Sequence, residues 1–431
     1  MEKTNKKISL IITIVFIVSL FIGVILLTYS KYLKNNNIYE EENNNKPTII
    51  SKDISMNLEQ TAGAGDYKTV TQSNWPIEGY KFNTELSRCE NESEISWDDT
   101  KKVVVVSGNL SDKCYVYFDL IPSITLVEHV TSLYTGTQGE NGIYYHDSSL
   151  TNGAGDSSYR YAGANPDNFV CFGSTASLCP TDNLYRIIGV FDENYHGVSG
   201  KQLVKLIKYD YANSNLLGTV GDYSASGTPD ASYYKGSLTT INTYYWNYKA
   251  DTANYNNTWS TSLLNKTNLN TNFINNIGTD WSKKIATTTW KVGGGTIENI
   301  RDVVPARAYQ YEVGSNASST TYDAKIGLMY ASDYGFGAVP EAWTTTLYNY
   351  DGSVNGSTIR IQNWMYMGYS EWTISRTAND LSRSFFVGYG GGFVNYNIVY
   401  NANGVRVAFN LEPTVTYVSG TGTQSDPIII N

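Results

Sequence analysis

The chain has 431 residues, a formal net charge of −9 at pH 7, only 16% charged residues and 36 tyrosines. This length allows more than one domain with its own core. The sequence lacks the basic stripe that a phosphate backbone demands, which excludes nucleic-acid binding. The surface must instead consist mainly of asparagine, serine, threonine, tyrosine and glycine.

The first predicted element is an apolar segment, ISLIITIVFIVSLFIGVILLTYS at 8–30. Residues 8–28 contain no charge and no proline, which is enough for a helix across the ~30 Å hydrocarbon layer. A cleaved signal peptide is the alternative, but its apolar region is usually ~7–15 residues long and ends in a small-residue cleavage site. We therefore expect a cytoplasmic tail at 1–7, a transmembrane anchor at 8–30 and a single-pass cell-membrane protein whose bulk is extracellular.

All four cysteines follow this segment, and they form two close pairs, Cys89 with Cys114 and Cys171 with Cys179. An even set in close pairs predicts disulfides formed in an oxidising compartment. Neither spacing is that of a zinc site, and none of the three histidines lies in a metal-binding motif. We therefore expect no metal and no cofactor.

Residues 31–62 are rich in asparagine and glutamate and show no apolar periodicity, which predicts a flexible stalk. From 63 to 121 the pattern changes to short β-branched and aromatic runs between turn residues. The expected strands lie at 79–83, 93–99, 101–108 and 113–120. They predict a small all-β, sandwich-like module that a Cys89–Cys114 disulfide closes.

The rest of the chain, 122–431, has the pattern of one α+β domain. Two strands are expected at 183–191 and 201–210, around a turn-rich connection. The clearest helix is 259–278, where Leu269, Phe273 and Ile277 recur every four residues and Ser260 or Ser262 can cap the start. A core strand that runs into a turn is expected at 325–337.

The C-terminal stretches predict paired strands joined by glycine-rich turns. In YNIVYNANGVRVAFNL, residues 396–411, the alternation of Val405, Val407 and Phe409 indicates a strand. Arg406 lies among these apolar positions and is expected, like Arg376, to be structural. A core carboxylate such as Glu371 would pair with Arg406.

Several of these stretches resemble a largely uncharacterised family of bacterial surface proteins from Firmicutes and Mollicutes relatives. They are NLYRIIGVF, LVKLIK, WSTSLLNKTNLNTNF, KIATTTWKVGG, AKIGLMYASDYGF, NWMYMGYSEWTISR and NGVRVAFNL. Members end in a C-type-lectin-like domain of the formylglycine-enzyme and retroelement-variable-protein type. The resemblance covers roughly 140–431 and implies that Trp372–Arg376 and Gly404–Phe409 form core strands, although Val405 stands where the commonest pattern has phenylalanine. It implies fold and surface display more than activity.

Catalytic patterns are sparse. Formylglycine-generating catalysis needs a reactive cysteine pair in the C-terminal sheet, whereas the last cysteine here is Cys179. The sequence contains no nucleophile elbow, P-loop or dinucleotide fingerprint, and it lacks the calcium and sugar motifs of C-type lectins. Two alternatives stay open, a cell-envelope hydrolase that uses carboxylates such as Asp333 and Glu371, and a structural envelope component with no ligand.

The favoured hypothesis is a membrane-anchored extracellular binding or adhesion protein that recognises a protein or glycan through a Tyr/Asn-rich face. Tyrosine and tryptophan offer large contact area with few rotatable bonds, and asparagine adds adaptable hydrogen bonds. The ligand-binding candidates are Trp372, Tyr389, Asn395, Tyr396, Asn397, Tyr400, Asn401 and Asn403. The competing interpretation is an ordinary polar surface, because the whole chain is rich in tyrosine and asparagine.

Overall fold

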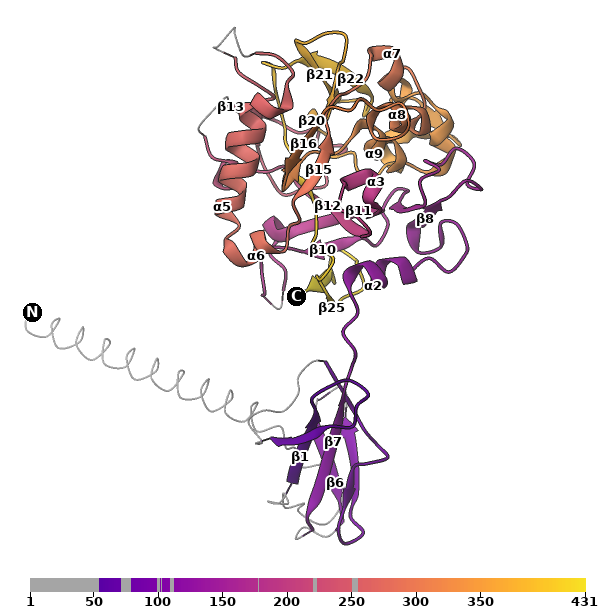
Figure 1. Ribbon diagram of the computed structural model, residues 1–431, viewed down its shortest axis with the longest axis vertical. Helices are drawn as coiled ribbons and strands as arrows, with labels where there is room; N and C mark the ends of the chain where they lie inside the picture. Colours follow the sequence, from indigo (N-terminus) through magenta and orange to yellow (C-terminus); the bar gives the residue numbers. More distant parts are fainter. Residues whose placement is uncertain are drawn as a thin grey trace, which may run out of the picture. The chain divides into compact units, whose positions relative to one another are not determined.

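The structure is a computed structural model. It describes residues 54–431 except 71–78, 99–100, 102, 109–111, 177, 220–222 and 250–254. The chain forms two compact units, which divide between Ser123 and Ile124. Figure 1 shows strands in the described part of the first unit and strands mixed with short helices in the second. The protein is therefore a mixed α+β protein built mainly from sheets.

The membrane anchor expected at 8–30 lies outside the described residues, as does the tail expected at 1–7. In the part of the chain that the structure describes, no helix is long and apolar enough to cross a membrane. The longest helical run there, 264–276, is interrupted by several asparagines. The expected fold class and the expected single-pass localisation both depended on a transmembrane helix, so both are corrected: the structure does not support a membrane anchor.

The first unit is a two-layer β module. Its strands are β1 (Ile54–Glu59), β2 (Tyr67–Val70), β3 (Tyr80–Phe82), β4 (Arg88–Cys89), β5 (Glu94–Asp98), β6 (Val103–Ser107) and β7 (Cys114–Leu120). One sheet has the order β2–β1–β7–β3, and β4 also pairs with β7. The β5–β6 hairpin packs on this sheet, where the Trp97 ring lies 5.1 Å from the Phe118 ring and 6.5 Å from the Phe82 ring. The expected disulfide is confirmed, because Cys89 is bonded to Cys114 on the neighbouring strand.

Strand β1 occupies part of the segment expected to be a stalk. Met56 and Leu58 are buried in the core of the module. The polar residues alternate with them, and Glu59 accepts hydrogen bonds from the Gly65 and Leu120 amides at 2.7 and 3.0 Å. Apolar residues at every second position are typical of a strand, but a six-residue segment with polar side chains between them gave too weak a signal in the sequence.

The second unit is organised around a nine-stranded sheet. Its strands are β8 (Ile143–His146), β9 (Ser158–Tyr161), β10 (Phe169–Cys171), β11 (Leu184–Phe191), β12 (Leu203–Lys208), β17 (Ile326–Gly327), β24 (Ala408–Asn410), β25 (Tyr417–Ser419) and β26 (Ile428–Ile430). Every residue of β11 and β12 is buried, so these central strands are covered on both faces. The two expected strands at 183–191 and 201–210 are these two.

Strand β11 changes partner along its length at a bulge between Ile187 and Gly189. Its first half pairs with β10 and its second half with β9. A Cβ atom at Gly189 would lie 2.2 Å from the Tyr159 carbonyl oxygen, so only glycine permits this approach of β9.

The helices are short and surround the sheets. They are α2 (Leu126–Ser132), α3 (Glu193–His196), α4 (Ser214–Leu217), α5 (Ile274–Asn276), α6 (Thr279–Lys283), α7 (Ile297–Ile300), α8 (Pro305–Glu312), α9 (Ala331–Phe336), the π-helix η5 (Leu264–Phe273), and the 3₁₀ turns η2 (Glu140–Gly142), η3 (Thr181–Asn183), η4 (Trp259–Thr261), η6 (Pro340–Thr344), η7 (Leu347–Asn349) and η8 (Ile359–Gln362). The helix expected at 259–278 is present as η4, η5 and α5. Its middle is a π-helix, which suits the five-residue spacing of the buried Leu264 and Leu269. Residues 331–336, expected as a turn, form α9, whose first turn is closed by the Tyr330 N–H bond to Asp333.

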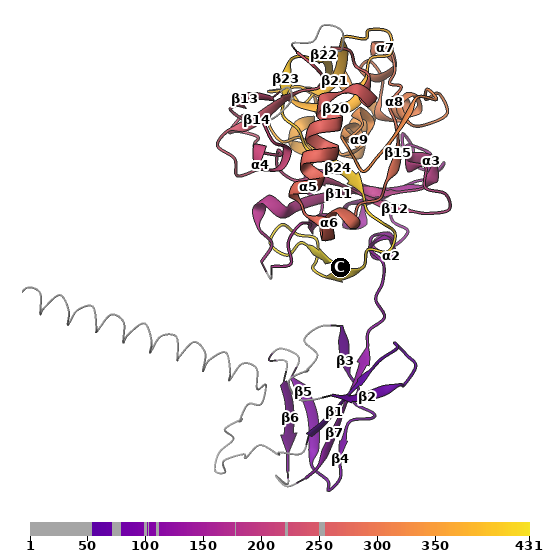
Figure 2. The same ribbon diagram turned by 60° about the vertical axis from the view of Figure 1, so that its left-hand side comes forward.

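Smaller sheets complete the second unit. They are formed by β13 (Tyr223–Gly227), β14 (Ile241–Tyr245) and β23 (Ala402–Asn403), by β15 (Thr288–Lys291) and β16 (Thr321–Ala324), by β18 (Ser353–Val354) and β19 (Ser357–Thr358), and by β20 (Glu371–Arg376), β21 (Arg383–Val387) and β22 (Val394–Ile398). Figure 2 shows β20, β21 and β22 near α7, at the upper end of this unit in the view. Among the described strands of the β20–β21–β22 sheet, β22 is at the edge, and β22 and the turn after it carry Asn395, Tyr396, Asn397, Tyr400 and Asn401, five of the eight predicted ligand-binding residues.

Candidate functional site

The backbone of β22 presents alternate amides to an open edge. The Val399 N–H donates to the Ser382 carbonyl at 2.9 Å, and the Gly388 N–H donates to the Phe393 carbonyl at 2.8 Å. Odd-numbered residues of this strand therefore point their backbone groups toward β21. The amides of Tyr396 and Ile398 point the other way, to the side where none of the described strands pairs with β22.

Asparagine side chains occupy these two outward amides. The Asn395 Oδ1 accepts from the Tyr396 N–H and the Asn397 Oδ1 accepts from the Ile398 N–H, both at 2.9 Å. Asn401 also donates to the Asn397 Oδ1, at 2.6 Å. Unpaired edge amides invite another strand, so these asparagines fix their own conformation and also protect the edge.

Tyr396 lies within a row of alternating aromatic rings and guanidiniums. The Arg383 guanidinium carbon is 4.7 Å from the Tyr396 ring centre. The Arg301 guanidinium carbon is 5.4 Å from the same ring centre and 4.6 Å from that of Tyr348. We call Tyr348, Arg301, Tyr396 and Arg383 the Tyr396 ladder. Cation–π contacts of this length are attractive, so each side chain restricts its neighbour.

An aspartate holds each guanidinium of the ladder. Arg301 donates through Nε and Nη2 to Asp302 at 2.7 and 3.1 Å, and the hydrogen bond to Asp302 raises the pKa of Arg301. The Arg383 Nε lies 3.1 Å from an Asp380 carboxylate oxygen. The two pairs leave the ladder with balanced charge.

An exposed leucine and two half-buried tyrosines continue from the ladder. Leu381 precedes β21 and Tyr400 follows β22, and the segment 255–257 contacts both, because the Asn257 amide donates to the Leu381 carbonyl at 2.7 Å. Leu381 is 61% exposed. Tyr400 meets the edge of another ring, that of Tyr255, at 5.5 Å and 81°. We define the β22 face as the Tyr396 ladder together with Leu381, Tyr400, Tyr255, Asn395, Asn397 and Asn401.

Two predicted ligand-binding residues, Trp372 and Asn403, are buried instead of lying on this face. Trp372 is 1% exposed, and its indole N–H donates to the Tyr244 carbonyl at 2.8 Å. Asn403 is 4% exposed and pairs with Tyr244 between β23 and β14. Tyr389 is 52% exposed but lies in the turn before β22, where its ring is 5.9 Å from the Tyr369 ring. Strand alternation and chain folding therefore divide a set of residues that are adjacent in sequence.

The two arginines expected to be structural are bonded inside the domain. Arg406 is 1% exposed and makes two hydrogen bonds of 2.7 Å to the Glu371 carboxylate. The strand expected at 404–409 forms only in part, since β24 begins at Ala408. Arg376 donates to the Val292 carbonyl at 3.0 Å and to the Asn257 Oδ1 at 3.1 Å.

The carboxylates considered for a hydrolase are internal. Asp333 is 1% exposed and accepts hydrogen bonds from Lys205 and Tyr195, each at 2.8 Å. Glu371 is also 1% exposed, and burial raises its pKa while Arg406 opposes the rise. Both groups are committed to ion pairs in the core. Their geometry does not favour acid–base work on a substrate.

A third buried acid, Glu312, has a pKa near neutral pH, the range in which a carboxyl group can both give up and take up a proton. Burial raises its pKa to about 7. Its oxygens accept from the Ala331 amide at 3.0 Å, from the Ser332 amide at 2.9 Å and from the Ser375 hydroxyl. A raised pKa can mark a catalytic acid, but Glu312 is 2% exposed and its oxygens join α9 to β20. Its role is structural.

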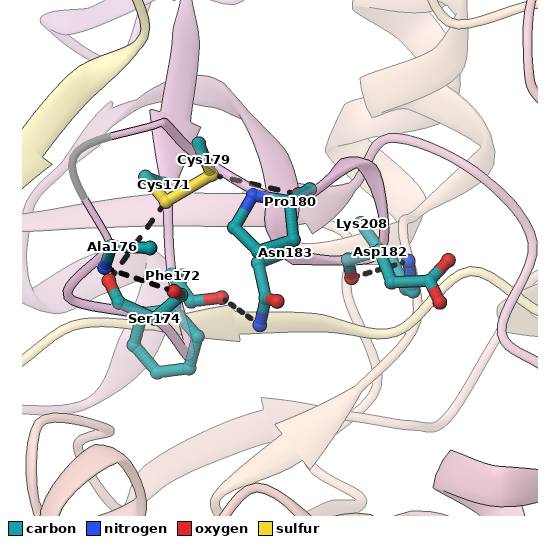
Figure 3. The surroundings of a disulfide bond; sticks show 9 residues. All are labelled: Cys171, Phe172, Ser174, Ala176, Cys179, Pro180, Asp182, Asn183 and Lys208. Carbon is teal, nitrogen blue, oxygen red and sulfur yellow. Dashed lines mark hydrogen bonds between the residues drawn. A yellow bond between two sulfur atoms is a disulfide. The ribbon is translucent and has the colours of Figure 1, made fainter. Parts of the chain in front are cut away.

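The second expected disulfide, Cys171–Cys179, is confirmed. Figure 3 shows that polar contacts order its surroundings: Asn183 donates to the Phe172 carbonyl at 3.1 Å, and Lys208 donates to the Asp182 carbonyl at 3.0 Å. Leu178, inside the disulfide loop, is 79% exposed. Among the residues with described positions, no group of three or more His, Cys, Asp or Glu could hold a metal ion.

Sequence reasoning missed five residues of the β22 face: Arg301, Tyr348, Leu381, Arg383 and Tyr255. Arg301 follows α7 and Tyr348 lies in η7, both far from β22 in the chain. Only the tertiary fold brings them to Tyr396. Leu381 stands in a polar segment, TANDLSRS, and an isolated leucine carries no periodic signal.

Comparisons with known proteins add no family or fold neighbour. No family model, no curated protein and no solved structure matches the chain. The resemblance to lectin-like surface proteins therefore stays a prediction.

Proposed function

We propose that the second unit is a binding module that recognises a protein or a glycan through the β22 face. The observation that carries the proposal is the Tyr396 ladder, in which Arg301 and Arg383 lie 5.4 and 4.7 Å from one tyrosine ring. Tyrosine and arginine are enriched in interfaces. Here both types are already held by neighbours, which lowers the entropy that binding would cost.

The asparagines support the same proposal. Besides protecting the edge, ordered amide side chains lower the entropy that a binding surface loses when a partner docks. On β22, Asn395 and Asn397 are bonded to the following amides, both at 2.9 Å, which restricts their side chains. The face is therefore preorganised over the whole length of the strand.

The test is a binding screen of the chain on printed protein and glycan arrays. A recombinant form must begin at or before Ile54, because β1 is an inner strand of the first sheet. The variant Tyr396→Ala/Tyr400→Ala removes two rings from the β22 face, and we expect it to lose most array binding. Tyr389→Ala is the matched control, because Tyr389 is 52% exposed and lies outside the face.

The opposite result would show that the binding site lies elsewhere in the chain. Undiminished binding by the double variant, with loss in Tyr389→Ala, would assign recognition to the turn before β22. Circular dichroism should show that both variants keep the wild-type fold, since neither Tyr396 nor Tyr400 is fully buried.

A further inference from the structure

The tyrosine rings of the β22 face are already in contact with guanidinium groups or with other aromatic rings. Carbohydrate rings stack through their C–H groups on the negative π-face of an aromatic side chain, which must be open. The Arg383 guanidinium is 4.7 Å from the centre of the half-buried Tyr396 ring, and Arg301 is 4.6 Å from that of Tyr348. The Tyr255 and Tyr400 rings meet edge to face at 5.5 Å. These tyrosines offer ring edges and hydroxyls more than open platforms.

The charge of the face is balanced pair by pair. Arg301 is bonded to Asp302, and Arg383 to Asp380. The two aspartate side chains are 39% and 36% exposed, so a partner meets their negative charge as well as the guanidiniums. A sulfated or carboxylated polysaccharide gains from unpaired cations, and this arrangement provides little of that gain.

The face also has an apolar anchor in a fixed position. Leu381 is 61% exposed, and its carbonyl accepts from the Asn257 amide at 2.7 Å, which holds its backbone. Burying a leucine side chain on association strengthens binding by about tenfold or more. An apolar pocket on a folded protein can supply that burial, whereas a hydroxyl-rich glycan cannot.

From these three observations we infer that the partner of the β22 face is a folded protein. Its surface has an apolar pocket for Leu381 and hydrogen-bond acceptors, such as backbone carbonyls, around the pocket for the tyrosine hydroxyls. This inference rests on the proposed function, because it names the partner class of that same face.

The experiment applies the full chain to an array of purified folded proteins and to an array of printed glycans. The test variant is Leu381→Asp, and the matched control is Leu178→Asp, because Leu178 is an exposed leucine in the loop closed by Cys171 and Cys179. We expect protein spots whose signal falls more than about tenfold in Leu381→Asp. We also expect Leu178→Asp to match the wild type, and binding to change little between about 0.05 and 0.5 M salt.

Each other outcome has a defined meaning. Binding confined to glycan spots, or protein binding that is insensitive to Leu381→Asp, overturns the protein-partner inference. In the first case the proposed binding function survives with a different ligand class. Silence on both arrays overturns the proposed function and this inference together. The melting temperature of Leu381→Asp should equal that of the wild type, because the side chain is mostly exposed.

Discussion

The guanidinium of Arg383 lies 4.7 Å from the ring centre of Tyr396, diagonally across the β21–β22 pair. The contact joins a residue of the inner strand to one of the edge strand. It therefore links the stability of the hairpin to the geometry of the proposed binding face.

A double-mutant cycle measures this contact. We expect Tyr396→Leu and Arg383→Gln to show a coupling of about 0.5–1 kcal/mol in the free energy of unfolding, measured with urea, because a partly exposed cation–π pair has that strength. The control cycle combines Tyr396→Leu with Arg307→Gln, since Arg307 contacts Tyr311 on α8 instead. Equal coupling in the two cycles would show that the ladder contact does not persist in solution.

Removing the edge asparagines should expose two amides. In Asn395→Ala/Asn397→Ala, the outward N–H groups of Tyr396 and Ile398 lose their acceptors. We expect their hydrogen exchange to quicken by more than about tenfold, and light scattering to detect self-association through the open edge. Asn401→Ala is the control, because it removes a donor to Asn397 and leaves both amide bonds in place. Unchanged exchange in the double variant would contradict the protective role.

The buried pair of Arg406 and Glu371 should be costly to break. Glu371→Gln leaves a guanidinium that is 1% exposed without its counter-charge, and we expect a loss of about 3–5 kcal/mol in unfolding free energy. Replacing both partners, as in Glu371→Leu/Arg406→Met, should recover most of that loss. Glu341→Gln, at an exposed position, is the control. A loss below about 1 kcal/mol in Glu371→Gln would mean that the pair is solvated.

The sequence predicted the structure correctly where an apolar run was long and where cysteines lay in close pairs. β11 and β12 are continuous apolar runs that are buried on both faces, and the cysteine spacing indicated both disulfides. β1 was missed because polar residues occupy every second position and are bonded internally. The π-helical part of 264–273 was not foreseen, because the four-residue pattern expected there does not separate an α-helix from a wider one.

The candidate site was predictable only in part, for a different reason. Tyr396, Tyr400 and the asparagines are close in sequence and stay close on β22. Trp372, on the inner side of its strand, turns its ring into the core, and Arg301 reaches Tyr396 from a remote segment. A composition argument locates a tyrosine-rich strand, but ring–guanidinium contacts between distant segments need the tertiary fold.

Glu312 should give the protein a pH-dependent stability near neutrality. Burial raises its pKa from 4.5 to about 7 in the folded protein, so folding takes up a proton between these values. The stabilising contribution is complete below pH about 4.5 and is lost as pH rises through about 7.

We therefore expect the free energy of unfolding to fall by about 1–3 kcal/mol between pH 5 and 8, relative to Glu312→Gln, whose side chain does not titrate. Urea titrations of both proteins at several pH values measure this difference. The other titratable groups are the same in the two proteins, so their contributions to the pH dependence cancel. Parallel curves for the two proteins would mean that the folded pKa of Glu312 lies close to its ordinary value. In that case the bonds from Ala331, Ser332 and Ser375 would outweigh the effect of burial on this carboxyl.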